Sequence, residues 1–411
     1  MRDRLLGIQP KDFDVATDAR PQQVETYFSG ALPVGAHFGV VRVQEGGAAV
    51  EVATFRSEGG YSDGRRPDEV RFETEPALDA QRRDFTINGL MEDPLTGEIF
   101  DYVGGRADLD GKTIRAIGDA GQRFHEDHLR MLRAVRFAAR LGFTIKDETR
   151  EAIQEQAEFV RAVSAERVRD ELVRILTEGG ARRGLELLDE LGLLKQVLPE
   201  VKAFQGVEQP PEYHPEGDVW THVLLMLQNM GAAVSPSLAM GVLLHDVGKP
   251  RTFRRAERIR FDGHAEVGAA MAGELLGRLR FSNDEVDHVT ALVANHMKFK
   301  DVRKMRTSTL KRFLRLPRFE EHLELHRLDC LSSHGGNEAY TFVRQKLAEM
   351  GVEALHPERL LSGSDLIAAG YTPGPRFGEA LEAVETAQLE GEARTRSEAL
   401  EIAKRVLDKV E

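Results

Sequence analysis

Cysteine and long apolar runs are nearly absent from this chain, and both absences limit what the protein can be. Cys330 is the single cysteine among 411 residues, so no disulfide can form within the chain and a reducing cytoplasm is expected. No run approaches the roughly 20 apolar residues that cross a bilayer, and the opening MRDRLLGIQP has no signal-peptide pattern. We therefore expect a protein without a membrane span.

An excess of positive charge is also missing. The net charge is -12 at pH 7, which argues against a protein that binds nucleic acid through its overall charge. Any contact with RNA must then come from local groups of basic side chains. The composition gives no indication of the oligomeric state.

Length and periodicity predict a multidomain α+β protein. At roughly 100–200 residues per domain, the 411 residues are enough for two to four domains. The first ~120 residues mix β-rich runs with helices, whereas helical periodicity dominates after Arg123. The Pro-rich stretch 210–217 indicates a linker or a loop beside a substrate site. We expect the segments 1–120, 121–205, 206–340 and 341–411.

Within the first segment, the β-rich runs are joined by turn signals. Residues 34–44 and 49–55 flank the Gly46-Gly47 pair, which predicts a β-hairpin. The stretch 56–70 is rich in glycine and charge and has no periodicity, which predicts a mobile loop.

Two carboxylates stand close together near the start of the chain. In KDFDVAT, strand alternation places Asp12 and Asp14 on one face and turns Phe13 toward a core. Such a pair can hold Mg²⁺, and Glu51, in a neighbouring β-rich run, is the candidate for a third acid. The alternative is a solvated strand face, because Asp-x-Asp pairs are common by chance.

Basic side chains at two further places suit phosphate binding. Arg83 supplies a forked donor beside the acceptor Asp84, which suits a phosphate and a sugar hydroxyl, although such a pair is also a common surface ion pair. A helix is expected from about Phe124. At 100° per residue, one arc of about 120° on this helix holds Arg130, Arg133, Arg136 and Arg140. This cationic face suits a polyanion, and the alternative is a solvated helix face.

Several strings occur in the order found in one enzyme family. KDFDVATDA, VEVATFRSEGGYSDGRRPDEV, RRDFTINGL, DPLTGEIFDYVGG and RFHEDHLRMLRAVRFAARLGF follow one another between residues 11 and 143. Together they closely resemble the class II tRNA nucleotidyltransferase and bacterial poly(A) polymerase family. The resemblance implies a nucleotidyltransferase palm of the polymerase beta type with a mixed sheet in 1–120, an all-α nucleotide-reading neck in 121–205 and a C-terminal helical tRNA-binding region in 341–411.

The resemblance also implies roles for individual residues. Asp12 and Asp14 would hold the metal that activates the RNA 3′-hydroxyl, with Glu51 as the candidate third acid. The implied nucleotide contacts are Arg56, Arg83, Asp84, Asn88, Glu126, Asp127 and Arg130, and the cationic helix face adds Arg133 and Arg136. In the family, the Asp and Arg of the EDxxR string read base edges, for which paired donors and an acceptor are suited. Arg56 would link the strand to the family's flexible loop, which is needed for adding the final A.

One part of the family signature is missing from the given sequence. The family has a strand that runs into Gly-Gly shortly before an Arg-Asp helix start, and such glycines cradle a triphosphate with backbone amides. The given chain starts at Met1-Arg2-Asp3. We expect this strand to lie upstream in the natural protein, and without it the chain would be weakly active.

A second constellation lies between Trp220 and Asp329. The strings WTHV, LLHDVGKP, DGHAEVG, ANHM and HRLDC resemble the ordered H, HD, D pattern of the HD phosphohydrolase superfamily, which implies an HD domain in 206–340. The implied metal ligands are His222, His245, Asp246, His264, His296 and Asp329. Such ligands suit a divalent metal that activates water for phosphoester cleavage. The alternative is a scaffold that keeps these residues without the chemistry.

The expected activity is Mg²⁺-dependent addition of CCA to the 3′ end of tRNA from CTP and ATP. Hydrolysis at the HD domain, with a second divalent metal, is expected beside it. An alternative in the same class is poly(A) or A-only addition. An alternative in another class is an HD phosphohydrolase whose nucleotidyltransferase half survives only as an RNA-binding module.

Overall fold

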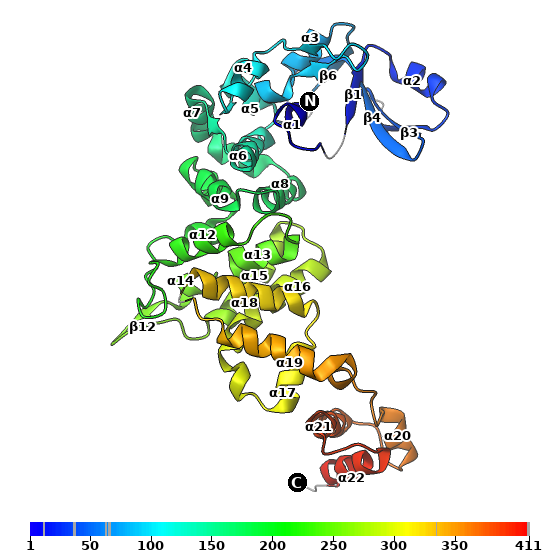
Figure 1. Ribbon diagram of the computed structural model, residues 1–411, viewed down its shortest axis with the longest axis vertical. Helices are drawn as coiled ribbons and strands as arrows, with labels where there is room; N and C mark the ends of the chain where they lie inside the picture. The colour runs from blue at the N-terminus through cyan, green and yellow to red at the C-terminus, as the bar shows by residue number, and fades with distance from the viewer. Residues whose placement is uncertain (11–12, 36–37, 62–63, 65–66, 334, 409–411) are drawn as a thin grey trace.

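The computed structural model describes residues 1–411 apart from 11–12, 36–37, 62–63, 65–66, 334 and 409–411. Figure 1 shows an elongated molecule in which a mixed α/β head stands at one end, with layers of helices below it and the C-terminus at the far end. In the described part of the chain, no helix has the length and apolarity that a membrane crossing requires.

A four-stranded sheet with the order β1-β4-β3-β2 forms the outer part of the head. Its strands are β1 (Asp14–Thr17), β2 (Ala31–Gly35), β3 (Val40–Glu45) and β4 (Ala48–Thr54). β1 runs parallel to β4, whereas the other neighbours are antiparallel. The predicted hairpin is β3–β4, and its turn requires glycine because Gly46 and Gly47 have φ of 58° and 83°.

The short helix α2 (Pro21–Tyr27) covers one face of this sheet. A small core forms there from Val24, Val41 and Val43. The predicted burial of Phe13 is wrong, since 67% of its surface is exposed. The reason is that Phe13 precedes the edge strand β1, while α2 packs on β2, β3 and β4.

The second half of the head consists of short elements. They are β5 (Arg56–Gly59), β6 (Glu69–Phe72), α3 (Pro76–Gln81), η2 (Thr86–Asn88), β7 (Met91–Glu92), β8 (Ile99–Phe100), α4 (Gly105–Asp110) and β9 (Thr113–Ile114), while α1 (Arg2–Leu5) opens the chain. The stretch expected to be a loop is in part regular, because β5 and β6 pair as an antiparallel ribbon. Ladder hydrogen bonds and ion pairs of Arg56 and Glu58 hold its two strands in place.

Helices dominate from residue 120. The next elements are α5 (Ala120–Glu126), α6 (Leu129–Leu141), β10 (Thr144–Ile145), α7 (Asp147–Gln156), η3 (Ala157–Ala162), α8 (Ala165–Thr177), α9 (Ala181–Glu190), α10 (Leu194–Val197) and α11 (Pro199–Lys202). The helix expected from about Phe124 is in fact two helices. Asp127 has extended angles (φ -148°, ψ 103°) and separates α5 from α6.

The HD region and the C-terminal region follow. The elements are α12 (Val219–Asn229), α13 (Pro236–Leu244), α14 (Lys249–Thr252), β11 (Arg254–Arg255), β12 (Ile259–Arg260), α15 (His264–Arg278), α16 (Asn283–Asn295), η4 (His296–Lys304), α17 (Thr307–Leu314), α18 (Phe319–Ser332), α19 (Glu338–Leu355), α20 (Gly363–Ala368), α21 (Arg376–Glu390) and α22 (Arg396–Leu407). The Pro-rich stretch 210–217 contains no helix or strand.

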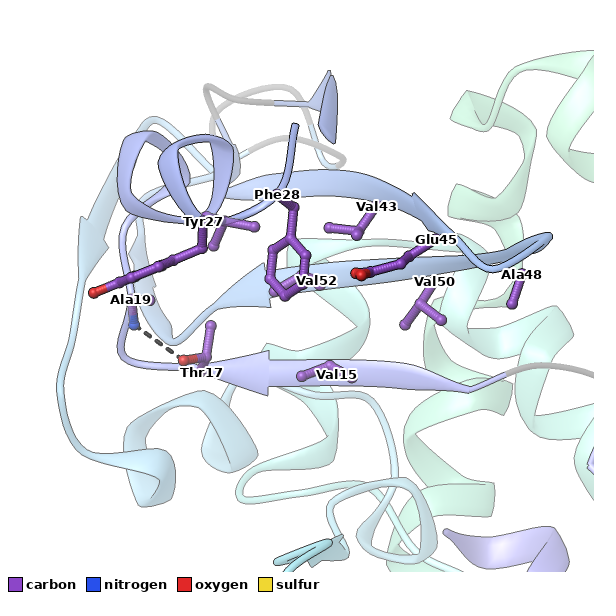
Figure 2. Close-up of a pocket in the computed structure, with 11 residues that line it drawn as sticks. Val15, Thr17, Ala19, Tyr27, Phe28, Val43, Glu45, Ala48, Val50 and Val52 are labelled. Atoms are coloured by element: carbon purple, nitrogen blue, oxygen red, sulfur yellow. Dashed lines mark hydrogen bonds between the residues drawn. The ribbon is translucent and has the colours of Figure 1, made fainter. Parts of the chain in front are cut away.

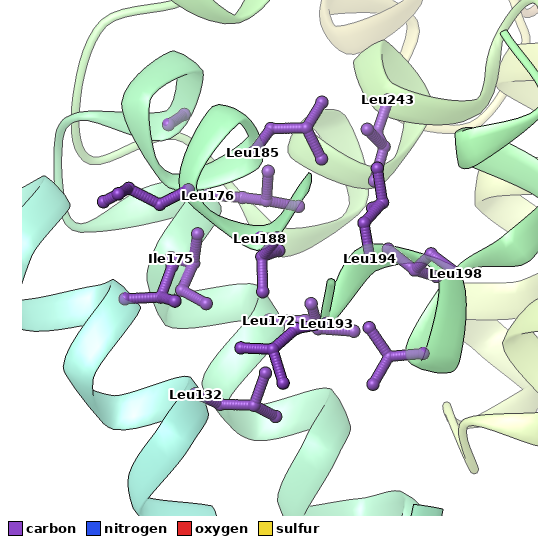
Figure 3. Close-up of a cluster of buried hydrophobic side chains, with 14 of the residues drawn as sticks. Leu132, Leu172, Ile175, Leu176, Leu185, Leu188, Leu193, Leu194, Leu198 and Leu243 are labelled. Atoms are coloured by element: carbon purple, nitrogen blue, oxygen red, sulfur yellow. The ribbon is translucent and has the colours of Figure 1, made fainter. Parts of the chain in front are cut away.

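The hydrophobic cores do not stop at the segment boundaries expected from the sequence. One core runs from Phe85 in the head through the neck leucines of Figure 3 to Leu328 in α18. A second core joins η4, α17, α18 and α19, so the expected boundary at residue 340 falls inside α19. A third core lies within α20–α22. The second half of the head thus shares its hydrophobic core with the helices. The four-stranded sheet has a separate small core.

Candidate functional site

Two of the three predicted acids lie side by side on the head sheet. Asp14 on β1 and Glu51 on β4 are partners in the parallel register, and Arg42 on β3 is aligned with Glu51. Neighbouring strands are about 4.8 Å apart and aligned side chains share a face, so these three charged groups form a row. Asp14 and Glu51 are both exposed. Asp12 lies outside the described residues.

The opposite face of the same sheet carries an apolar cavity of about 490 Å³. Val15, Val43 and Val52 line it from the strands, and Tyr27 and Phe28 close it from α2 and the residue after it (Figure 2). Period-2 alternation separates this cavity from Asp14 and Glu51. Its lining is almost entirely apolar, so it cannot bind a triphosphate, and the acidic face is the candidate for catalysis.

A connected network of ion pairs surrounds the predicted RRD string. Asp79 is paired with both Arg82 and Arg83, at 2.7 Å and 3.1 Å. Arg83 also donates to the carbonyl of Asn88 at 3.0 Å, and the Asn88 side chain donates to Asp84 at 2.9 Å. The structure therefore brings Arg83, Asp84 and Asn88 together.

The EDxxR string lies against the same network. Glu126 is paired with Arg130 at 2.7 Å and with Arg123 at 2.9 Å. Arg123 and Arg130 also donate to the backbone carbonyl of Arg82, at 3.2 Å and 3.3 Å. Arg130, which was predicted to read bases, thus contacts Arg82, the residue directly before the predicted nucleotide contacts Arg83 and Asp84.

Asp127 has a partner that the sequence reasoning missed. Arg167 on α8 forms a two-point ion pair with it, with N–O distances of 3.1 Å and 2.8 Å. A planar fork fixes the orientation of a carboxylate better than a single charge does. Arg167 lies 40 residues from Asp127 along the chain, and no local pattern marks it.

The arginines of α6 have different surroundings, although the sequence placed them on one face. Arg133 pairs with Asp84 at 2.7 Å and remains partly accessible. Arg136 is 5% exposed and pairs with Glu171 on α8 at 2.6 Å. Arg140 pairs with Asp3 at 2.8 Å. The alternative of a solvated helix face is therefore wrong, because Asp3 of α1, Glu171 of α8 and Asp84 neutralise these arginines.

Ion pairing shifts the pKa of two groups in this network against the effect of burial. Burial alone would raise the pKa of Asp84, but Arg133 and hydrogen bonds from Asn88 hold it below the ordinary value. Burial likewise penalises the charged form of Arg133, yet Asp84 and Glu171 raise its pKa overall. Both groups are thus charged, and each stabilises the other.

The ribbon β5–β6 connects the sheet to the network. Arg56 donates to the carbonyl of Phe38 and pairs with Glu58 at 2.7 Å, and Glu58 also pairs with Arg82 at 3.2 Å. Tyr61 donates a hydrogen bond to Glu58 and is near enough to Arg130 for that charge to affect its pKa. Since β4 passes directly into β5, Glu51 and the nucleotide network are parts of one continuous stretch.

In the HD region, the six predicted metal ligands converge. His222 Nε2 lies 3.2 Å from Asp329, and together with His245 these residues form a group whose ligand atoms are all within 4.8 Å of one another. Asp246, His264 and His296 form a second such group. In it, the two Nε2 atoms are 3.2 Å apart and lie 3.6 Å and 3.8 Å from Asp246.

The two groups share a boundary, since His245 and Asp246 are neighbours in sequence and lie 3.0 Å apart. The helices around them supply the hydrophobic packing that buries both residues to 1% exposure. Backbone carbonyls orient these histidine rings. Nδ1 of His245 donates a hydrogen bond to the carbonyl of Val242, and Nδ1 of His296 donates one to the carbonyl of Val293. Such contacts fix which nitrogen faces a metal.

Several buried polar atoms at this centre fit a metal ion. In the described part of the chain, His222 Nε2, His245 Nε2 and both carboxylate oxygens of Asp246 make no hydrogen bond of acceptable geometry, although Lys249 approaches Asp246 at 2.7 Å. Buried groups of this kind are normally satisfied. Imidazole and carboxylate ligands in this number suit a divalent transition metal.

A glutamate from the Pro-rich stretch completes the surroundings of His222. Glu216 bonds to Nδ1 of His222 at 2.7 Å and to Nδ1 of His214 at 2.9 Å. These hydrogen bonds lower the pKa of Glu216 to about 2 even though burial acts in the opposite sense. Of the two readings of this stretch, the structure thus favours the loop beside a site. Sequence reasoning missed Glu216, whose only signal was its place two residues before the cap of α12.

The charges of the ligands are strongly coupled. Burial opposes a charge on His222, but Asp329 and Glu216 raise its pKa to about 9. Burial lowers the pKa of His296 to about 4, helped by the charge of His245. The pKa of Asp246 is held well below its ordinary value by His245 and Lys249 against the effect of burial. The carboxylates are therefore ionised and His296 is neutral, which are the forms that bind metals, whereas His222 must release a proton when it becomes a ligand.

Comparison with known proteins assigns three stretches of the chain. Residues 1–115 match the poly A polymerase head domain, residues 142–205 the probable RNA and SrmB-binding site of polymerase A, and residues 219–326 the HD domain. A multifunctional CCA protein of Halorhodospira halophila is 37% identical over 398 residues, which cover 93% of this chain and 92% of the relative. This chain belongs to the CCA-adding enzyme and poly(A) polymerase family. The family and the fold class predicted from the sequence strings are thereby confirmed.

Two further comparisons give the extent of the similarity in sequence and in structure. A CCA-adding enzyme of Lactobacillus johnsonii is 38% identical over 236 residues, 56% of this chain and 58% of the relative. The chain thus spans somewhat more than half the length of that group of curated relatives. The crystal structure of the Bacillus stearothermophilus CCA-adding enzyme in complex with CTP has a TM-score of 0.74 at 27% identity. It covers 99% of this chain and 91% of that chain.

Proposed function

We propose that this family member adds CCA to the 3′ end of tRNA without a nucleic-acid template, using CTP and ATP and Mg²⁺. The observation that carries the proposal is the continuous path from Glu51, aligned with Asp14, through β5 to the network of Arg82, Arg130 and Glu126. The residues proposed to hold the metal and those proposed to hold the nucleotide are thus parts of one structure. The multifunctional CCA protein supports the same activity.

The residues divide the work of the transfer. Asp14 and Glu51, with Asp12, would hold Mg²⁺, which lowers the pKa of the attacking RNA hydroxyl and neutralises the phosphates. Arg83 and Arg133 would bind the triphosphate, and Asp84 with Asn88 the ribose.

The base would be read by Asp127 and Arg130, with Glu126 fixing the Arg130 guanidinium. Arg130 offers paired donors and Asp127 an acceptor, so the two together distinguish base edges. Arg56 would couple the ribbon β5–β6 to this reading. Arg136 is left out of the nucleotide site because it is buried against Glu171.

The proposal is tested by incubating the chain with tRNA that lacks its CCA end, labelled CTP and ATP, and Mg²⁺. Addition of two C and one A supports it. Addition of A alone would support the poly(A) or A-only alternative, and no addition would leave the HD hydrolase as the function of the chain.

We propose a second activity, metal-dependent phosphohydrolysis at the HD centre. The buried atoms of His245 and Asp246 that lack hydrogen bonds carry this proposal. A metal bound there would activate water. On a 2′,3′-cyclic phosphate, the water oxygen bonds to phosphorus, the bond to the 3′-oxygen breaks, and that oxygen takes the proton. The product has a free 3′-hydroxyl, which is the acceptor that CCA addition needs.

The HD activity is tested with 2′,3′-cyclic AMP and with the variants His245→Ala and Asp246→Asn. Loss of hydrolysis in both variants, with CCA addition unchanged, is expected. Equal hydrolysis by the wild type and both variants would show that the activity comes from elsewhere.

The proposed organisation follows from the two activities. A palm in 1–120, a nucleotide-reading neck in 121–205 and an HD domain in 206–340 follow the order of the matched families, and the proposed tRNA-binding region in 341–411 lies beyond the matched residues. The tRNA substrate also agrees with the cytoplasm expected from the single cysteine.

A further inference from the structure

A β-hairpin projects from the HD region beside the proposed metal centre. It consists of β11 and β12, which pair antiparallel, and Figure 1 shows it extending away from the helices. Its two strands connect Asp246, through α14, to His264. The base of the hairpin is therefore fixed at both ends by residues of the proposed centre.

Arginine dominates this hairpin. The exposed arginines between residues 251 and 260 are Arg251, Arg254, Arg255, Arg258 and Arg260, while Glu257 is the one acidic residue of that stretch. Arg255 is paired with Glu208. Ion pairs for the other four are absent among the described residues. A cluster of this kind contrasts with the net charge of -12 of the whole chain.

Two aromatic rings stand at the base of the hairpin. Phe253 is 37% exposed, and its ring centre lies 5.9 Å from that of Phe261. Phe261 in turn packs against His264, with ring centres 6.4 Å apart, and lies 5.3 Å from the ammonium of Lys249. An accessible ring next to arginines is what proteins use to stack an unpaired base.

We propose that the hairpin binds the single-stranded 3′ end of RNA and directs it into the HD centre. Arg254, Arg258 and Arg260 contact backbone phosphates, and Phe253 stacks a base near the terminus. The substrate class of the HD centre is then an RNA that ends in a phosphate or cyclic phosphate, in preference to a free nucleotide. This inference rests on the proposed HD hydrolysis.

The position of the hairpin is the main argument for this substrate class. A free mononucleotide has one base and one terminal phosphate, which the centre itself can hold. It offers nothing to arginines along a projecting ribbon. A polynucleotide has a row of phosphates that can follow the ribbon away from the centre, and repeated phosphate contacts give salt-dependent binding.

The test compares an RNA of about eight nucleotides that ends in a 2′,3′-cyclic phosphate with 2′,3′-cyclic AMP. The hairpin variant is Arg254→Gln, Arg258→Gln, Arg260→Gln in the full chain. The matched control removes the same charge elsewhere in the HD region, by Lys300→Gln, Lys304→Gln, Arg306→Gln at exposed positions. The hydrolysis rate is measured over a range of salt concentrations.

We expect kcat/KM of the hairpin variant to fall about tenfold on the RNA, since each exposed phosphate contact contributes modestly. Its log–log salt slope should decrease by about 2, from three lost contacts on a single strand. Hydrolysis of cyclic AMP should stay unchanged, and the control variant should match the wild type on both substrates. Equal losses on both substrates, or no loss on the RNA, would overturn the inference.

A second measurement does not depend on hydrolysis. The RNA carries 4-thiouridine at its penultimate position, and the photo-crosslinked peptides of the full chain are identified by mass spectrometry. Adducts within 251–263 support the inference, and adducts confined to other segments overturn it. If the wild type hydrolyses neither substrate, the proposed HD activity fails, and the crosslink still decides whether the hairpin binds RNA.

Discussion

The acids of the head and the proposed ligands of the HD centre differ in burial and in how firmly the fold holds them. Asp14 and Glu51 are exposed on a sheet whose own core is small, and folding fixes only their register. His245 and Asp246 are 1% exposed and lie in the turn between α13 and α14, against the main core. Like charges are tolerable in water, whereas buried ionisable groups need partners. The exposed head acids are therefore stable without an ion, and the buried groups of the HD centre fit one.

The ion-pair network around Arg82, Arg83 and Arg130 is intermediate between these two sites in burial. Its arginines are held by acids of the protein itself, such as Asp79, Asp84 and Glu126, so folding orders them before any nucleotide binds. A nucleotide would then compete for groups that are already in place. The predictions below separate the three kinds of site, in order of the expected effect.

The head acids should matter for chemistry and hardly at all for stability. Asp14→Asn should reduce CCA addition about a thousandfold, because several kcal/mol of charge stabilisation by the metal is lost. Urea unfolding and hydrolysis of cyclic AMP should be unchanged, since the residue is exposed. Arg42→Gln, in the aligned position on β3, serves as a nearby control, and an equal loss there would contradict the assignment.

The HD centre should depend on its supporting carboxylate. Glu216→Gln should weaken divalent metal binding about 10- to 100-fold, because Nδ1 of His222 loses the group that orients it. Isothermal titration with Mn²⁺ or Ni²⁺ measures this. Glu212→Gln, exposed on the same stretch, should bind metal normally. Unchanged affinity in the Glu216 variant would mean that His222 is not a ligand.

Arg167 should act on base selection through Asp127. Arg167→Lys keeps the charge and removes the two-point contact, so kcat/KM for CTP should fall about tenfold and discrimination against UTP should decrease. Arg161→Gln, exposed nearby on η3, is the control. A loss of rate with discrimination intact would point to a purely structural role of Arg167.

Asp84 should contribute stability whose pH dependence has a definite sign. Asp84→Asn should cost about 2 kcal/mol at pH 7, because Arg133 loses its buried partner. The pKa of Asp84 is lowered in the folded state, so its contribution is present above the unfolded pKa of about 4 and is lost as pH falls through the folded pKa.

The difference in urea unfolding between wild type and variant should therefore shrink from pH 7 to pH 2.5. Asp110→Asn, exposed and weakly paired, should show little difference at either pH. A gap that grows on acidification would contradict the assigned ion pair.

Local pattern was sufficient for much of the fold and of the candidate site. Short strings predicted the Gly46-Gly47 turn and placed Glu51 on a neighbouring β-run, and the residues that they proposed as HD ligands lie together in the structure. These residues carry the signal themselves, because turn geometry and metal ligation each demand particular residue types. The prediction that Phe13 is buried was wrong, because strand alternation shows which side of the sheet a residue is on but not which element covers that side.

Contacts over long distances in sequence were beyond any local pattern. Arg136 belongs to a cationic arc by periodicity, yet Glu171 on another helix takes it out of solvent. Asp3, from the first helix, does the same for Arg140. A helical wheel shows which residues share a face, and the neighbouring element decides whether that face meets water, acid or nucleotide.

The sequence by itself determined the family, the order of the regions and which residues are candidates for the chemistry, because motifs and hydrophobic periods are local properties of the chain. Only the tertiary structure decided that Arg167 pairs with Asp127 and that Glu216 accepts a hydrogen bond from His222. It also decided that the arginine hairpin lies beside His264. Each of these contacts forms because helices and loops that are distant in sequence pack on a shared core. The free energy of that packing depends on several segments at once, so no single segment predicts it.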